Sequence, residues 1–176
     1  MTPTAAPDRI AMLGSFPPVR GVSGYCLELA HAMATRCRVE FISFNNMYPR
    51  RLYPGGGLAD DPTFPNASHP RLRVHRNLNW YNPAGWLRAG ISTPGDLLHA
   101  QWWSLPLAPV YLTVCAAFRQ RRKPVVITVH NALPHETSQA YIEASRVLFA
   151  LGDHFIVHTE QNRRQLASHY RIPESR

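Results

Sequence analysis

The chain has 176 residues, of which 45% are hydrophobic and 17% charged. This length and composition suit one globular domain with a sizeable core, and they exclude a largely disordered protein. The formal net charge of +8 favours an anionic partner, but without a run of five basic residues or an RNA-binding or zinc-finger pattern it does not indicate nucleic acid.

The first part of the chain reads as a strand, a glycine-containing loop, a helix and a second strand. Residues 9–15 form a short apolar run ending in glycine, as in a buried parallel strand. After the loop, apolar residues recur at helical spacing through 25–35, and Ser23 is placed to cap that helix. The next strand is predicted at 39–44.

An irregular insertion is predicted at 45–70, because this stretch holds five prolines and a glycine triplet. Such a loop is either functional or mobile. Beyond it, 71–76 alternates apolar and basic residues like an edge strand, and 96–100 reads as a buried strand. Residues 79–94 are expected to link these two strands irregularly or as a short helix.

The rest of the chain alternates regularly between helices and strands. The predicted elements are a helix at 110–122, a strand at 125–129, a helix at 138–151, a strand at 154–158 and a helix that Thr159 caps and that runs to residue 170. This alternation predicts an α/β fold: a Rossmann-like three-layer sandwich with a mostly parallel sheet of about six strands and helices on both faces.

The helix at 110–122 overlaps a longer uncharged stretch, 102–118, which just reaches the ~17-residue lower limit for spanning a bilayer. Pro106 and Pro109 would interrupt a spanning helix near its start, but they suit a loop and the first turn of a buried helix. We therefore expect a buried crossover helix, with peripheral contact on the cytoplasmic face of the membrane as the alternative.

The three cysteines, Cys26, Cys37 and Cys115, are odd in number and widely spaced. They are interpreted as buried thiols of a reducing compartment. The N-terminal residues lack the continuous apolar core of a signal peptide. Both observations favour a cytoplasmic location.

Ligands of such a sheet bind outside the carboxyl ends of the strands, where the strand order switches. Gly21 and Gly24 lie in this position, just before a helix N-terminus whose free N–H groups and dipole favour an anion. Their spacing from Gly14 does not match the dinucleotide fingerprint, and there is no P-loop lysine. From the residues alone, a phosphate-contacting loop and a plain turn are equal alternatives.

Two histidines and a carboxylate, His130, His135 and Glu136, follow the strand at 125–129. An imidazole there can donate a hydrogen bond to a sugar hydroxyl or a phosphate oxygen; a purely structural histidine is the alternative. A zinc site is disfavoured, because His130 and His135 lack same-face helical spacing and no cysteine pair lies near the other histidines. No metal is therefore predicted.

Trp102 and Trp103 follow the strand at 96–100. Their indoles are suited either to stacking on a sugar or base, or to filling the core. Nucleophilic hydrolase chemistry has little support, because there is no Gly-x-Ser-x-Gly elbow and no cysteine at a strand end.

Four segments, in order, resemble glycosyltransferase family 4, the retaining GT-B enzymes. Residues 14–30 are similar to that family's first strand, glycine loop and helix, residues 96–103 and 126–136 to its middle strands, and residues 152–160 to its late strand. The resemblance implies that residues 1–176 are the N-terminal, acceptor-side half of a GT-B fold. The donor-binding C-terminal domain is expected outside these residues.

The resemblance also implies the reaction and its residues. A sugar passes from a nucleotide donor to an acceptor with retained anomeric configuration, without a cofactor. His130 matches the family histidine that contacts the donor sugar, and the loop of Gly21, Val22, Ser23 and Gly24 matches the one facing the donor phosphates and acceptor. Many members have adjacent glycines there, whereas Val22 and Ser23 separate them here.

The further donor or acceptor contacts predicted by position are Trp102, Trp103, Asn131, His135 and Glu136. The alternative from another class is a non-catalytic, basic Rossmann-like module that binds an anionic partner or a membrane surface.

Overall fold

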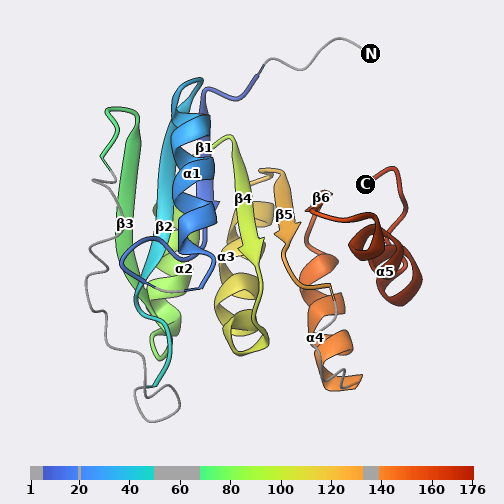
Figure 1. Cartoon of the computed structure of the whole chain (residues 1–176). Helices are drawn as coiled ribbons and strands as arrows, with labels where there is room; N and C mark the ends of the chain where they lie inside the picture. The colour runs from blue at the N-terminus through green and yellow to red at the C-terminus, as the bar shows by residue number, and fades with distance from the viewer. Residues whose placement is uncertain (1–5, 20, 50–67, 133–138) are drawn as a thin grey trace.

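The computed structural model describes residues 6–19, 21–49, 68–132 and 139–176 (Figure 1). In chain order the elements are β1 (Arg9–Leu13), α1 (Ser23–Ala34), β2 (Arg38–Asn46), β3 (Leu72–Asn79), α2 (Pro83–Ser92), β4 (Leu97–Trp102), the short 3-10 helix η1 (Leu105–Leu107), α3 (Ala108–Gln120), β5 (Val125–Val129), α4 (Gln139–Phe149), β6 (His154–Val157) and α5 (Glu160–Tyr170).

The six strands form one sheet in the order β3-β2-β1-β4-β5-β6, and every pairing is parallel. The predicted Rossmann-like α/β fold is therefore confirmed. The chain builds outward from β1 to β3, then returns to place β4 on the other side of β1. This reversal is the topological switch point of the sheet.

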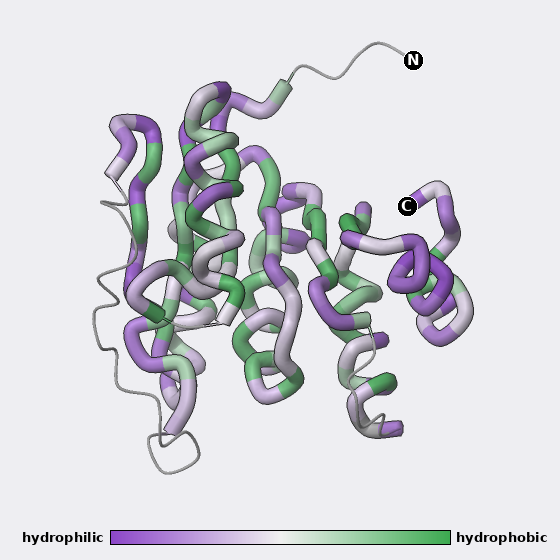
Figure 2. Tube along the Cα trace, viewed as in Figure 1, coloured by the Kyte–Doolittle hydropathy of each residue, from purple (hydrophilic) through white to green (hydrophobic). Residues whose placement is uncertain are grey.

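The two faces of the sheet are set by alternation along its strands. In β1, Ile10 and Met12 pack into the cluster beneath α1, whereas Ala11 and Leu13 belong to the larger cluster on the other face, with α2 and α3. Figure 1 shows these three layers, and Figure 2 shows α3 with hydrophobic residues along much of its length while α5 is mainly hydrophilic.

Helix boundaries depart from the sequence prediction at two places. Helix α1 begins at Ser23, and Val22 precedes it without any side-chain cap, so the predicted capping role of Ser23 is wrong. Residues expected to be an irregular or short helical link contain the ten-residue helix α2, whose first turn Asn82 caps by accepting from Gly85 N at 3.0 Å. The predicted Thr159 cap is confirmed, with Asn162 N donating to Thr159 Oγ1 at 3.1 Å.

The uncharged stretch at 102–118 does not form one helix. It divides into the end of β4, η1 and most of α3, with Pro109 in the first turn of α3. No helix in the described ranges is long and apolar enough to cross a membrane. Most of the predicted insertion at 45–70 lies outside the described residues.

The three cysteines are buried free thiols, as predicted. Burial raises the pKa of Cys26 and of Cys115 to about 12. Both thiols therefore stay protonated and pack as small apolar side chains.

Helices α2 and α3 approach each other closely at Gly90. A Cβ atom at this position would lie 2.6 Å from Ala117 Cβ and 3.2 Å from the Val114 backbone, well inside ordinary van der Waals contact. Gly90 is fully buried within α2, where a glycine normally lowers helix stability relative to alanine. Close packing of the two helices therefore outweighs the intrinsic helix preference at this site.

We expect Gly90→Ala to lower the free energy of unfolding by about 1–3 kcal/mol, because the added methyl group forces α2 away from α3. Ala84→Ser, at an exposed position of the same helix, should change it by less than about 0.5 kcal/mol. Urea unfolding of both variants measures the difference. A stabilised Gly90→Ala protein would mean that the two helices are farther apart than described.

Candidate functional site

The carboxyl ends of the strands lie at one edge of the sheet, the lower edge in Figure 1. The switch point between β1 and β4 opens a crevice there in folds of this type. Gly14 follows β1 and lies against Gln101 of β4: a Cβ on Gly14 would be 3.2 Å from Gln101 Cβ and 3.1 Å from Cys26 Sγ. The absence of a side chain at Gly14 allows β1, β4 and α1 to meet at this point.

His130 follows β5 at the same edge. Its backbone N–H donates to Trp102 O at 2.9 Å, which fixes the residue beside the end of β4. The ring is half-buried, and its Nε2 lies 3.1 Å from Gln101 Oε1. With this oxygen as the acceptor, His130 carries its proton on Nε2 and leaves Nδ1 as an acceptor.

A second histidine, His158, follows β6 and completes the arrangement. Its Nε2 lies 3.3 Å from His130 Nδ1, and the two rings are 5.0 Å apart. Tyr25, in the first turn of α1, places its ring 4.8 Å from His130 and 5.1 Å from His158, edge-on to both. Three elements far apart in the sequence therefore meet around one imidazole.

The environment of His130 keeps the ring neutral near pH 7. Burial, and then the neighbouring His158 and His99, lower the pKa of His130 to about 4. His99 lies one strand away, fully buried, with its Nε2 2.7 Å from Thr128 Oγ1, and burial lowers its pKa to about 4 as well. A neutral ring at position 130 can donate one hydrogen bond and accept another.

The predicted glycine loop lies beside this group. Gly21 has a φ of +108°, a conformation that favours glycine, and a Cβ there would be 3.4 Å from Ser15 Oγ and 3.5 Å from Trp103 Nε1. Gly24 belongs to the first turn of α1, directly before Tyr25. Tyr25 therefore connects the two features: it follows the glycine loop in the chain, and its ring contacts His130.

The two tryptophans have separate roles. Trp102 is fully buried and packs edge-on against Tyr111 at 5.5 Å, so none of its faces is open for stacking on a ligand, and it belongs to the core. Trp103 is only partly buried and lies beside Gly21. Asn131, which is exposed, donates from Nδ2 to Trp103 O at 3.5 Å. His135 and Glu136 lie outside the described residues.

Two buried polar groups at this edge lack a partner. Within the described chain, Ser15 Oγ and Gln101 Nε2 are fully buried and make no hydrogen bond. An unpaired buried polar group costs roughly 1–3 kcal/mol, and native proteins keep few of them. Their position beside Gly21 and His130 marks the carboxyl edge of β1 and β4 as a place with unused hydrogen-bonding capacity.

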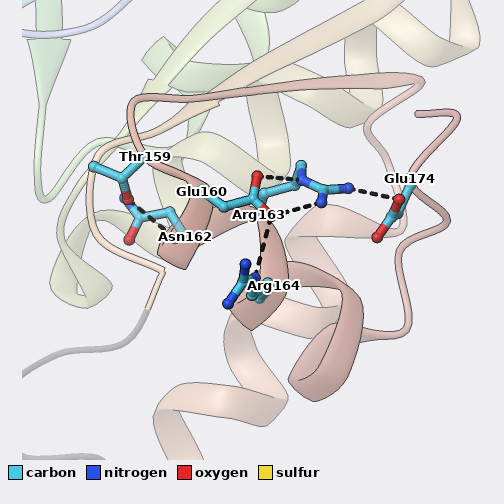
Figure 3. A network of polar contacts seen from close by, with 6 residues as sticks. All are labelled: Thr159, Glu160, Asn162, Arg163, Arg164 and Glu174. Carbon is cyan, nitrogen blue, oxygen red and sulfur yellow. Dashed lines mark hydrogen bonds and ion pairs between the residues drawn. The ribbon is translucent and has the colours of Figure 1, made fainter.

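Helix α5 also begins at this edge, but its N-terminus is already neutralised. Glu160 in the first turn receives hydrogen bonds from Arg163 Nε at 2.7 Å and Arg164 Nε at 3.1 Å, and Arg163 also pairs with Glu174 at 2.6 Å (Figure 3). Arg163 and then Arg164 lower the pKa of Glu160 to about 2, so its carboxylate stays charged. By contrast, α1 has no acidic residue in its first turn and no side-chain cap. The N-terminus of α1 is therefore more open to an anion than that of α5.

Sequence reasoning missed three contributors: Gln101, His158 and Tyr25. Tyr25 carries no motif of its own. Gln101 directly follows the strand predicted at 96–100, and His158 is the last residue of the strand predicted at 154–158. These positions at strand ends are the available signal for both.

The sequence profile described as Glycosyltransferase Family 4 matches residues 19–176. The chain belongs to glycosyltransferase family 4. A comparison with curated proteins found no match. Membership associates this domain with glycosyl transfer, and the matched region includes Gly21, Trp103, His130 and His158.

The two depressed histidine pKa values predict how the stability of this glycosyltransferase domain depends on pH. Both rings have a pKa near 4 in the folded chain, below the ordinary value of 6.5, so the unfolded chain binds more protons between these limits. Their contribution to stability is present above about pH 6.5 and is lost as the pH falls through 4. The free energy of unfolding should therefore decrease from pH 6.5 to 4.5.

Urea unfolding at several pH values measures this dependence. His99→Gln should flatten it, because the variant removes one of the two groups. An identical dependence in wild type and His99→Gln would contradict the depressed pKa of His99.

Proposed function

We propose that this chain forms the N-terminal, acceptor-side domain of a retaining glycosyltransferase, which transfers a sugar from a nucleotide-sugar donor to a glycan, lipid or small-molecule acceptor. Family membership supports glycosyl transfer, and the grouping of Gly21, Tyr25 and His130 at the carboxyl edge of the sheet supports the location of the site. A second, C-terminal Rossmann-like domain of a GT-B fold would form the other wall of the cleft and hold most of the donor.

The contacts of the His130 ring are the observation on which this proposal rests. In the free chain both its nitrogens have protein partners, with Gln101 Oε1 at 3.1 Å and His158 Nε2 at 3.3 Å. The longer contact with His158 is the easier one for a ligand to replace. We propose that a sugar hydroxyl or phosphate oxygen takes that position, while Gln101 keeps the ring oriented.

The N-terminus of α1 is proposed to face the donor phosphates. Gly21 and Val22 lead into the helix, and Ser23 and Gly24 belong to its first turn, which carries no acid and no side-chain cap. Free backbone N–H groups with a positive dipole end stabilise the charge that the departing nucleotide diphosphate gains in the transition state. Ser15 Oγ and Gln101 Nε2 offer further unused hydrogen-bonding groups at the same edge.

The acceptor is proposed to lie along Trp103 and Asn131. Trp103 is partly exposed with its indole beside Gly21, and the exposed Asn131 donates from its amide to the Trp103 backbone carbonyl. Sugars are commonly recognised by such a combination of stacking and hydrogen bonding. His135 and Glu136, which follow in the chain, are proposed as further contacts.

The proposed reaction needs no resident cofactor, because the nucleotide sugar already carries an activated anomeric carbon. We also propose that the protein acts in the cytoplasm without a metal, with the cytoplasmic face of the membrane as a place of peripheral contact. The formal charge of +8 supports contact with an anionic surface.

We expect His130→Ala in the complete enzyme to lower kcat by roughly 10²-fold or more, because an orienting group close to the reacting sugar is lost. Circular dichroism should show that the fold is kept. His169→Ala, at an exposed position of α5, serves as the control and should retain full activity. Unchanged steady-state kinetics of His130→Ala would refute the role of this residue.

The 176-residue chain by itself should fold but should not catalyse transfer. It contains its own six-stranded sheet and two buried apolar clusters, so its core does not depend on another domain. Catalysis requires donor and acceptor to be held at about 3–3.5 Å, and this chain supplies one wall of the cleft. We expect donor dissociation constants of about 1 mM or weaker, equivalent to about −4 kcal/mol.

Calorimetry and a product assay with several sugar nucleotides test this expectation. Micromolar donor binding would place the main donor site in this domain. Binding of anionic vesicles by the complete protein, without transfer to any acceptor, would favour the alternative of a non-catalytic binding module.

A further inference from the structure

A polar cavity lies at the opposite, amino edge of the sheet, the upper edge in Figure 1. It is open to solvent and has a volume of about 770 Å³. Its walls come from the beginnings of β1, β2 and β4 and from the residues that follow α1 and α3. Six cationic side chains line this amino-edge pocket: Arg9, Arg36, Arg38, Arg71, Arg121 and Lys123.

The amino-edge pocket carries more positive charge than its carboxylates and the neighbouring helix C-termini can neutralise. Two lining carboxylates, Asp8 and Asp96, oppose the six cations. Helices α1, α2 and α3 end at the pocket, and each C-terminus contributes about half a negative charge, which some basic residues would normally complement. These three helix ends offset only about one and a half of the four excess charges.

Two carboxylates near the amino-edge pocket, Asp96 and Glu40, are already engaged. Asp96 accepts from Arg9 N at 3.1 Å and lies 3.6 Å from Lys123 Nζ. Glu40, behind the pocket wall, is 2.7 Å from His75 Nε2 and 4.0 Å from Arg9 Nε. These contacts involve Arg9 and Lys123 and leave the other four guanidinium groups without a carboxylate partner among the described residues.

Two of these four arginines are held in place by neutral acceptors. Arg121 donates from Nη1 to Gly90 O and Thr93 O, both at 2.9 Å, and its guanidinium lies 4.7 Å from the centre of the Phe118 ring. Arg71 donates from Nη1 to Thr35 O at 3.4 Å. Carbonyl acceptors orient a guanidinium without neutralising it, so these groups are preorganised for an anion.

The remaining two arginines, Arg36 and Arg38, are exposed at the pocket, and their side chains make no ion pair or hydrogen bond within the described ranges. Guanidinium groups bind phosphate oxygens in a bidentate manner. Several guanidinium groups surround one large open cavity. This arrangement fits an anion with more than one phosphate group better than it fits a single small ion.

We propose that the amino-edge pocket binds a phosphoryl anion with two or more phosphate groups. The pocket is separate from the crevice at the carboxyl edge, because the five residues of β1 between them span about 16 Å at ~3.3 Å per residue. Binding here does not depend on the proposed transfer reaction. A free polyphosphate-type solute and a membrane lipid headgroup carry the same chemistry, and the experiment separates them.

The test uses inorganic triphosphate as the soluble probe, with calorimetry on the 176-residue protein. Wild type should bind it, and the affinity should fall as the salt concentration rises. The double variant Arg36→Gln/Arg38→Gln should weaken binding by about tenfold or more, since it removes two unneutralised guanidinium groups. Both residues are exposed, so the fold is expected to survive, and circular dichroism checks this.

Arg73→Gln/Arg88→Gln is the matched control. It removes the same net charge from exposed residues of β3 and α2 that do not line the pocket. This control should keep wild-type affinity. Equal weakening in both double variants would overturn the proposal, because it would reduce the effect to the overall charge of the molecule.

Vesicles of cardiolipin, whose headgroup carries two phosphates, and of phosphatidylcholine distinguish the two sources of phosphate. Triphosphate binding that is lost in Arg36→Gln/Arg38→Gln, with no vesicle binding, supports a soluble ligand. Binding of cardiolipin vesicles alone, lost in the same variant and kept in the control, supports a lipid headgroup. If the wild-type protein binds neither triphosphate nor anionic vesicles, the proposal is wrong.

Discussion

The parallel pairing of β1 with β4 is the constraint on which the rest of the structure depends. Because the chain completes β2 and β3 on one side of β1 before it returns to form β4, the connections after β1 and β4 leave toward opposite faces of the sheet. A crevice follows from this divergence. Gly14 allows the close approach, since a side chain there would meet both Gln101 and Cys26. The same pairing sets Gln101 at the position where its side chain reaches His130 on the next strand.

Burial at that junction decides the protonation state of His130. Gln101 and Thr128 are fully buried polar residues of adjacent strands, and His99 is almost completely buried between them. A charged imidazole would be poorly solvated in these surroundings, so burial, and then the neighbouring His158 and His99, lower the pKa of His130. The proposed binding chemistry of His130 therefore depends on the buried side chains of the surrounding strands as much as on the histidine itself. A ring at the same place in an open loop would titrate near neutral pH.

The sequence predicts most of the fold, because the strands and helices of a parallel sheet have distinct periodicity. The strand at 125–129 is placed correctly to the residue, and Thr159 is identified as a cap. Helix α2 is predicted only as an irregular or short link, since glycine and proline lower its local signal, and its stability comes from packing of Gly90 against α3.

Gln101 and Tyr25 could not be predicted as neighbours of His130, because their contacts exist only after β4, β5 and α1 are brought together. Trp102 and Trp103 are adjacent in sequence, but strand alternation sends one into the core and leaves the other at the crevice.

The formal charge of +8 gives no indication of where an anion would bind, whereas the topology does. In a parallel sheet with helical crossovers, helix N-termini gather at the carboxyl edge and helix C-termini at the amino edge. At the carboxyl edge, an anion can be stabilised by backbone N–H groups of α1, with few charged side chains. At the amino edge the backbone offers carbonyl groups, which repel anions, so any anion there has to be bound by side chains. Six cationic residues gather at that edge, and four of them have no carboxylate partner in the described chain. Their charge opposes the unfavourable dipoles of the helix C-termini, as an anion site at this edge requires. One topology therefore separates two kinds of anion recognition, by backbone at one edge and by guanidinium groups at the other.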